Sequence, residues 1–135
     1  MPKDPSTRKV TAAEARMYAL KAEEYLEAAE ENLENGRYNA ATSLAVHAGI
    51  NAADAISGAR QGSRLAAKDH SRAVKFLSET GQDGAEASKQ LARLIPLKTR
   101  AEYDPIRLTK TQATGAVRAA RNIVEIANRV LLSLG

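Results

Sequence analysis

The sequence predicts an all-α fold, an up-down bundle of four to five helices. Strand-forming patterns are almost absent, whereas alanine is abundant and apolar residues recur at helical spacing. The connections between the expected helices are short, which favours antiparallel packing of neighbours. The 135 residues fit one domain, which is large enough to bury a core without disulfides.

The first helix is expected over residues 11–35. Thr11 and Glu14 form a capping-box pattern at its start. Behind them, a regularly spaced apolar face is accompanied by a glutamate-rich outer face, as in an amphipathic helix. Residues 1–10 contain two prolines and are expected to be a disordered lead to a single domain over residues 11–135.

A second helix is expected over residues 39–58, with Asn39 as its N-cap. It is apolar over most of its circumference, which indicates a central helix packed on several sides. Residues 58–68 contain two glycines and three basic side chains, and are expected to form a mobile, positively charged connector. The helix keeps one narrow polar stripe, made of Ser43, His47, Asn51 and Asp54.

Two further helices are expected before the last connection. A short third helix, over residues 69–81, is expected to be capped by Asp69. A fourth helix, over residues 83–98, is expected to end or kink at Pro96, because proline lacks the N–H that the helix needs.

The last helix is expected over residues 109–133. It follows a tight connection that contains Pro105, which disfavours helix at the preceding residue. Thr109 and Gln112 form a second capping-box pattern at its start.

Composition excludes several classes of chemistry. Cysteine is absent, so disulfides, thiolate metal sites and cysteine nucleophiles are excluded. The two histidines offer few metal ligands, and no metalloprotease, EF-hand, P-loop or nucleophile-elbow motif is present, so we expect no metal and no cofactor. No apolar run reaches the roughly 18 residues of a membrane span, and no secretory signal is recognised, so a cytoplasmic protein without membrane contact is expected.

Charge is distributed unevenly along the chain, whose net charge is +4. Residues 1–36 carry five basic and eight acidic side chains, whereas residues 37–135 carry fifteen basic and eight acidic ones. The basic part could attract phosphates or an acidic partner, or it could be an ordinary solvated surface. With one Phe and four Tyr, a broad base-stacking platform is not expected.

The polar stripe of the second helix is the first candidate site. His47, Asn51 and Asp54 follow one another at helical spacing and so share a face. An imidazole beside an aspartate is oriented and made more basic, as general-base catalysis requires. The competing interpretation is a buried polar patch between helices or across a dimer.

Arg64 and His70 are a second candidate pair, in the basic connector. An arginine could stabilise phosphoryl charge while a histidine moves a proton, which is the minimum that a metal-independent ribonuclease needs. The competing interpretation is a solvent-facing histidine in the first turn of the third helix.

Two more groups of polar residues are candidates for ligand binding. Arg100, Tyr103 and Asp104 precede Pro105 and favour a structural latch, with an ion pair and a tyrosine anchored in the core. The last helix carries a charged face that favours surface ion pairs over a phosphate-binding ridge. Its residues are Arg118, Arg121, Asn122, Glu125 and Arg129.

Three segments together resemble the HEPN family, over residues 11–133. They are YNAATSLAVHAGINAADAI in the second helix, KDHSRAVKFL in the third, and RAEYDP before the long apolar last helix. The resemblance implies a helical bundle, commonly a homodimer, that binds nucleotide or RNA. It also implies a toxin–antitoxin or defence-type system with a nucleotidyltransferase-type partner.

Many HEPN proteins are ribonucleases that use an arginine followed four to six residues later by a histidine. In the last helix Arg121 and Asn122 match the start of that motif, but Glu125 and Ile126 occupy the positions where the motif requires a histidine. The favoured hypothesis is therefore a nucleotide- or RNA-binding protein without strong catalysis. The alternatives are a metal-independent ribonuclease toxin using Arg64 and His70, and a helical protein-interaction module.

Overall fold

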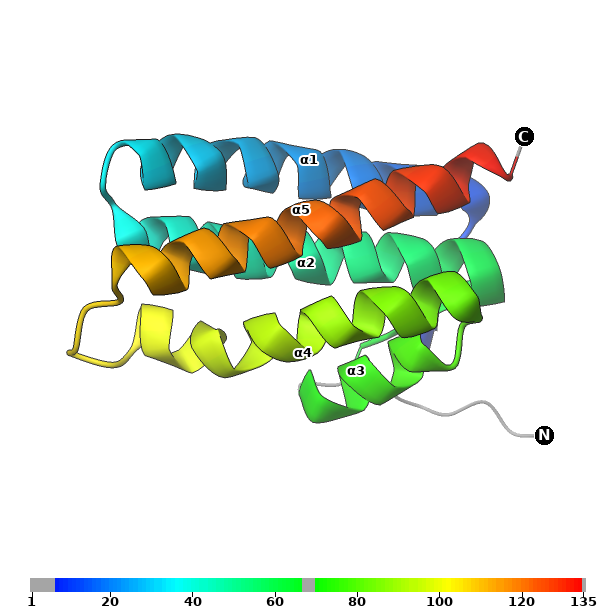
Figure 1. The fold of residues 1–135 in the computed structure, drawn as a ribbon. Helices are drawn as coiled ribbons and strands as arrows, with labels where there is room; N and C mark the ends of the chain where they lie inside the picture. Colours follow the sequence, from blue (N-terminus) through cyan, green and yellow to red (C-terminus); the bar gives the residue numbers. More distant parts are fainter. Residues whose placement is uncertain (1–6, 67–69, 135) are drawn as a thin grey trace.

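The computed structural model describes residues 7–66 and 70–134, the first two residues of the second range by their backbone alone. In chain order the elements are β1 (Thr7–Lys9), α1 (Ala12–Glu34), α2 (Tyr38–Gln61), β2 (Ser63–Leu65), α3 (His70–Ser78), α4 (Gln82–Glu102) and α5 (Lys110–Leu132). The four long helices, α1, α2, α4 and α5, run alternately up and down, and the short helix α3 lies beside α4 (Figure 1). The all-α, up-down bundle is thereby confirmed.

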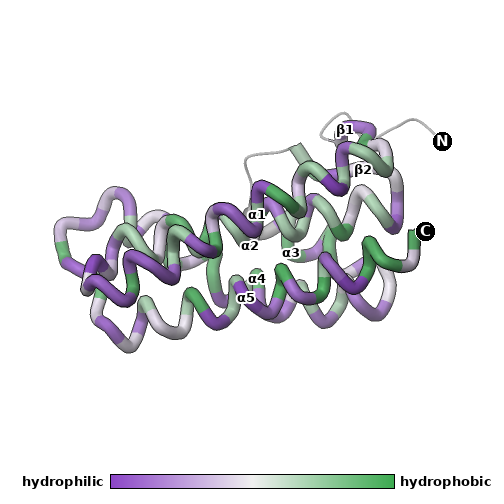
Figure 2. The backbone as a smooth tube through the Cα atoms, turned by 90° about the horizontal axis from the view of Figure 1, so that it is seen from above, coloured by the Kyte–Doolittle hydropathy of each residue, from purple (hydrophilic) through white to green (hydrophobic). Residues whose placement is uncertain are grey.

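Helix α2 is the centre of the bundle, because α1, α4 and α5 all pack against it. Helix α5 also contacts α1 and α4 and so closes the bundle. Hydrophobic and hydrophilic residues alternate along each long helix, as amphipathic helices around one core require (Figure 2). Many core residues are alanines that are fully buried, which lets the helices approach closely.

Both expected capping boxes are present. The Thr11 backbone N–H donates to Glu14 Oε1 over 2.9 Å, and the Glu14 N–H donates back to Thr11 Oγ1 over 3.1 Å. The first of these bonds holds the pKa of Glu14 below its ordinary value, because it favours the ionised carboxylate. At the start of α5 the Thr109 N–H donates to Gln112 Oε1 over 2.9 Å.

The structure differs from the sequence-based expectation at the N-terminal lead and in the connector. Residues 7–9 are strand β1, which pairs antiparallel with β2 so that Arg8 lies opposite Arg64. Val10, only 4% exposed, follows β1 into the core. The connector expected over 58–68 is instead the end of α2 followed by β2; residues 67–69, including the expected cap Asp69, lie outside the described residues. Three-residue strands are too short to produce a recognisable alternation.

Asn39 does not cap α2. The helix already begins at Tyr38, and no side chain bonds its first turn. The Asn39 amide is used over a long range instead: its Oδ1 accepts the Leu108 N–H over 2.8 Å and its Nδ2 donates to the Ala101 carbonyl over 3.5 Å. This tertiary contact, which ties α2 to the connection before α5, outweighs the local capping preference.

Pro96 does not end α4, which continues to Glu102. Proline removes the bond to the carbonyl four residues earlier, that of Ala92. Both Ala92 and Pro96 are exposed, so water can satisfy that carbonyl. The apolar face of α4 continues past the proline through Ile95 and Leu97, which pack against the core. As a result the last turn of α4 carries residues that sequence analysis placed in a tight connection.

Candidate functional site

The polar stripe of α2, here called the α2 polar row (Ser43, His47, Asn51 and Asp54), lies away from α5. Gly49 is two residues beyond His47 and therefore on the far side of the helix, where a side chain would meet Leu94 and Ile123 of the core. Partners of the row come from α1, α4 and β2. The row is thus an outer face of the central helix, flanked by three other elements.

At one end of the row, His47 meets Glu102 from the last turn of α4. His47 Nε2 lies 3.7 Å from Glu102 Oε1, and Ser43 Oγ donates to the same oxygen over 3.4 Å. Lys98 Nζ is 3.4 Å from the other carboxylate oxygen. The imidazole, 43% exposed, also stacks on the Tyr25 ring with centroids 5.4 Å apart. This end therefore combines an accessible imidazole, an ammonium group and an aromatic face.

The carboxylate beside His47 is not the one that the sequence suggested. Spacing on α2 pointed to Asp54 as the partner, but the structure pairs His47 with Glu102 and Asp54 with Arg64. Asn51 lies between them and donates from its side chain to the His47 carbonyl over 2.8 Å. The three residues share a face, as predicted, but belong to two separate clusters.

At the other end of the row, Asp54 lies near Arg64 of β2. Arg64 Nη1 is 4.0 Å from Asp54 Oδ2, too long for a hydrogen bond, and the guanidinium carbon lies 5.6 Å from the centre of the Tyr18 ring. Burial raises the pKa of Asp54 to about 7, although the charges of Arg64 and Lys21 oppose this shift. A carboxyl group that titrates near neutral pH is characteristic of functional sites.

The residues that complete the two clusters were missed by sequence analysis. Glu102 lies inside the RAEYDP segment but was not among the residues predicted there, and Lys98 is one turn before it on α4. Recognising that α4 continues past Pro96 would have revealed this i, i+4 pair. Tyr18 and Tyr25 of α1 pack against the core, and their contacts with α2 and β2 depend on tertiary packing.

The predicted latch does not form. Tyr103 is 76% exposed and so is not anchored in the core. Asp104 accepts the Ile106 N–H over 2.9 Å in a local turn, and Arg100 is exposed at the end of α4. The prediction of a latch was wrong because helix α4 continues through residue 102 and turns Tyr103 outward. Among the described residues, no hydrogen bond or ion pair joins any of the three to the α2 polar row.

The charged face of α5 forms ion pairs with other helices. Arg121 pairs with Glu30 of α1 at 3.2 Å, and Arg129 pairs with Asp83 of α4 at 2.9 Å. Arg118 and Glu125 are exposed. The ion-pair interpretation therefore holds for two of the arginines, with partners across the bundle in place of partners along α5.

The Arg64–His70 pair is described in part. Arg64 lies in β2 and points toward Asp54 and Tyr18. His70 is the first residue of α3, and its side chain lies outside the described residues.

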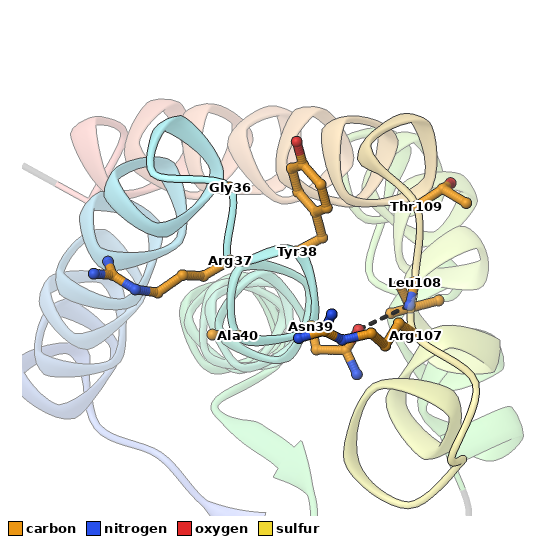
Figure 3. A pocket seen from close by; sticks show the side chains of 8 residues that line it. All are labelled: Gly36, Arg37, Tyr38, Asn39, Ala40, Arg107, Leu108 and Thr109. Atoms are coloured by element: carbon orange, nitrogen blue, oxygen red, sulfur yellow. Dashed lines mark hydrogen bonds between the residues drawn. The ribbon is translucent and has the colours of Figure 1, made fainter.

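A cavity of about 610 Å³ surrounds the start of α2 at one end of the bundle. Figure 3 shows its lining side chains, with Arg107 near Asn39 and Arg37 on the opposite side of α2. Both arginines are exposed. The cavity is an open hollow between α2 and the connection before α5, and its charged groups are solvated.

No group of three or more His, Asp or Glu side chains in the described part of the chain gathers closely enough to hold a metal ion. None of the described helices has the length and apolar character needed to cross a membrane.

Comparison with protein families decides the assignment of the chain. The model of the HEPN domain matches residues 15–130, which is most of the chain. The protein belongs to the HEPN family. A search of curated proteins found no match.

The segments that suggested the HEPN family meet in the fold. The first is helix α2, and the third begins in the last turn of α4. His47 of the first segment contacts Glu102 of the third. The described part of the second segment, from residue 70 to residue 77, lies in α3 and lines the pocket near Asp54. The α2 polar row is therefore where the characteristic parts of this HEPN domain converge.

Proposed function

We propose that this HEPN domain binds nucleotide or RNA along the α2 polar row and has no strong catalytic activity of its own. The observation that carries the proposal is the arrangement of cations and tyrosine faces on one side of α2. At one end His47 stacks on Tyr25, and Lys98 lies on the other side of the Glu102 carboxylate that His47 contacts. At the other end Arg64 lies beside Tyr18.

This arrangement suits a nucleic-acid ligand. Cationic side chains attract phosphates, and the imidazole of His47 and the guanidinium of Arg64, each placed against a tyrosine ring, offer planes on which bases can stack. His47 and Lys98 are partly exposed, at 43% and 26%, so both can reach a ligand. The carboxylate of Glu102 contacts both groups and so orients them.

Weak or absent catalysis is supported by α5. Arg121, which matches the start of the ribonuclease motif, is paired with Glu30. At the positions where a histidine is wanted, Glu125 is exposed and Ile126 is buried in the core. A carboxylate does not supply the protonated imidazole that the leaving group needs.

We also propose that the protein is a homodimer. Met17, Leu20 and Leu132 are 60%, 58% and 83% exposed. A hollow of about 470 Å³ between α1 and α5 adjoins them, and its lining includes Arg16 and Glu23. A two-fold interface must be self-complementary, and this patch offers an apolar surface together with one basic and one acidic side chain, Arg16 and Glu23.

A place in a toxin–antitoxin or defence-type system and a nucleotidyltransferase-type partner remain predictions from the HEPN resemblance. A cytoplasmic location remains a prediction from the sequence. Co-purification with a candidate nucleotidyltransferase, followed by mass measurement of the complex, tests the partner.

The binding test is fluorescence anisotropy of a short labelled single-stranded RNA, titrated with the protein over a series of salt concentrations. For Lys98→Gln we expect weaker binding and a salt slope smaller by about 0.7, the value for one lost phosphate contact on a single strand. Lys89→Gln is the matched control, because Lys89 is an exposed lysine of the same helix. It should leave both quantities unchanged.

The same samples should be run on a gel with and without chelator. Intact RNA is the expected result. Chelator-resistant cleavage that disappears in His70→Ala would instead support the ribonuclease toxin. Absence of any salt-dependent binding by the folded protein would favour the helical interaction module.

A further inference from the structure

A cavity of about 150 Å³ opens beside the Asp54 end of the α2 polar row. Its walls come from α2, β2, α3 and α4, and most of them are apolar, including Phe76, Leu77 and Leu91. Asp54 and Arg64 are the charged residues among the described lining. Both are partly exposed, at 19% and 30%, so the polar edge of the cavity faces the solvent.

Asp54 lacks a close partner in this cavity. No hydrogen bond to its carboxyl group forms within the described part of the chain, and Arg64 at 4.0 Å is its nearest cation. A carboxyl group that is mostly buried without a hydrogen bond is costly, and a ligand that donates and accepts hydrogen bonds would remove that cost. The lining thus offers two hydrogen-bonding oxygens at the edge of an apolar slot.

The size of the cavity favours one aromatic ring. A cavity of about 150 Å³ with comparable apolar walls holds a molecule of benzene. Phe76 and the small side chains of Ala53 and Ala73 provide apolar surfaces for a flat ring. A bicyclic purine is larger, so the shape favours a pyrimidine.

We propose that this cavity is the subsite for a pyrimidine base, whose Watson–Crick edge bonds to Asp54 while Arg64 holds the adjoining phosphate. The proposal rests on the proposed nucleotide- or RNA-binding function and names its ligand more narrowly. Proteins recognise unstacked bases in this way: they form hydrogen bonds to the edge of the base and pack apolar or aromatic side chains against its faces. The Arg64 guanidinium lies over the Tyr18 ring, and this contact holds it in position to bind the phosphate.

The protonated form of Asp54 matches the base. A neutral carboxyl group has one donor and one acceptor. It can donate to N3 of cytosine and accept from its amino group, or donate to O4 of uracil and accept from its N3–H. Because the pKa of Asp54 is about 7, the group loses this donor as the pH rises through that value.

Few described charges modulate this titration. Arg64 from β2 and Lys21 from α1 lower the pKa of Asp54, and burial raises it more. The described lining from α3 and α4 is apolar and consists of Ala73, Phe76, Leu77 and Leu91. Base binding should therefore be strongest below pH about 7 and weaken above it.

The test is isothermal titration calorimetry of the full chain with cytidine, uridine and adenosine. Each titration is made at two pH values, one pH unit below and one pH unit above the Asp54 pKa of about 7. Nucleosides are used because they carry no titrating phosphate. We expect both pyrimidines to bind, adenosine to bind roughly tenfold more weakly or not at all, and pyrimidine binding to fall at the higher pH.

Asp54→Asn separates a base contact from a structural role. The amide keeps one donor and one acceptor, so this variant should bind pyrimidines equally well at both pH values. Asp54→Leu should lose binding, and Asp104→Asn, at a distant turn, should behave as wild type. Equal binding of adenosine, or unchanged pH dependence in Asp54→Asn, would overturn the proposal.

The two proposals can fail separately. Salt-dependent RNA binding without any binding of cytidine or uridine would overturn the pyrimidine subsite and leave the proposed function intact. Loss of RNA binding as well would overturn both.

Discussion

At the scale of single residues, Asp54 shows how burial and charge compete. Two cations, Arg64 and Lys21, favour its ionised form, but removal of the carboxyl group from water has the larger effect and raises its pKa to about 7. The 4.0 Å separation from Arg64 explains this result, because a hydrogen-bonded pair would have favoured the charge more strongly. A neutral carboxyl group next to an apolar cavity is the consequence.

Glycine has a packing role at the centre of the bundle. Gly49 lies on the face of α2 that meets α4 and α5, where an added Cβ would overlap Leu94 Cδ1 and lie 3.4 Å from Ile123 Cδ1. Both neighbours are fully buried and have little room to move. Small residues on α2 therefore set the distance between the central helices.

Gly49→Ala should destabilise the fold by about 1–2 kcal/mol, because overpacking outweighs the better helix propensity of alanine. Urea unfolding followed by circular dichroism measures the change. The control is Gly115→Ala in α5, where an added Cβ meets nothing within 4 Å. That variant should gain about 0.5–1 kcal/mol. Equal effects at both positions would contradict the packing role of Gly49.

At the scale of the element, helix ends are decided by local chemistry where a capping box exists. Helices α1 and α5 begin directly after Thr11 and Thr109, each with reciprocal hydrogen bonds to the third residue of the helix. Helix α2 has no such box, and its start is fixed by the bonds of Asn39 to the α4–α5 connection. Sequence patterns were correct for the first kind of end and wrong for the second.

Thr109→Ala should cost about 0.5–2 kcal/mol, because it leaves N–H groups in the first turn of α5 without their side-chain acceptor. Thermal unfolding by calorimetry measures the loss. Thr111→Ala is the matched control, since Thr111 is exposed within the same helix and makes no capping bond. An equal loss in both variants would show that the capping box adds nothing to stability.

At the scale of the whole molecule, ion pairs connect three helices at one end of the bundle. Asp83 of α4 accepts from Arg60 of α2 and from Arg129 of α5, each over 2.9 Å. The bond from Arg129 is the main reason that the pKa of Asp83 is below its ordinary value. These groups are largely solvated, so their contribution to stability is small and screened by salt.

The exposed apolar patch at the same end should govern assembly. Leu20→Glu and Leu132→Glu should convert the proposed dimer to a monomer, because each buries a charge in an apolar interface. Analytical ultracentrifugation measures the mass, and circular dichroism checks the fold. Ile106→Glu is the control, since Ile106 is 69% exposed but lies in the connection before α5. A monomeric wild-type protein would refute the dimer.

Three features could be predicted from the sequence alone: the helical bundle, the two capping boxes and the shared face of His47, Asn51 and Asp54. All three depend on residues within a few positions of one another, where helical spacing and hydrogen-bonding type are sufficient. The three segments that resemble the HEPN family were also enough for an assignment that the family match confirms.

The side chains that complete the site could not be predicted, because they are brought together by tertiary packing. Glu102 reaches His47, and Arg64 reaches Asp54 and the Tyr18 ring, from elements that are far away in the sequence or in an unforeseen strand. Such pairings depend on which helices become neighbours and how far each one extends. Those outcomes follow from the packing of the entire core, and no local pattern encodes them.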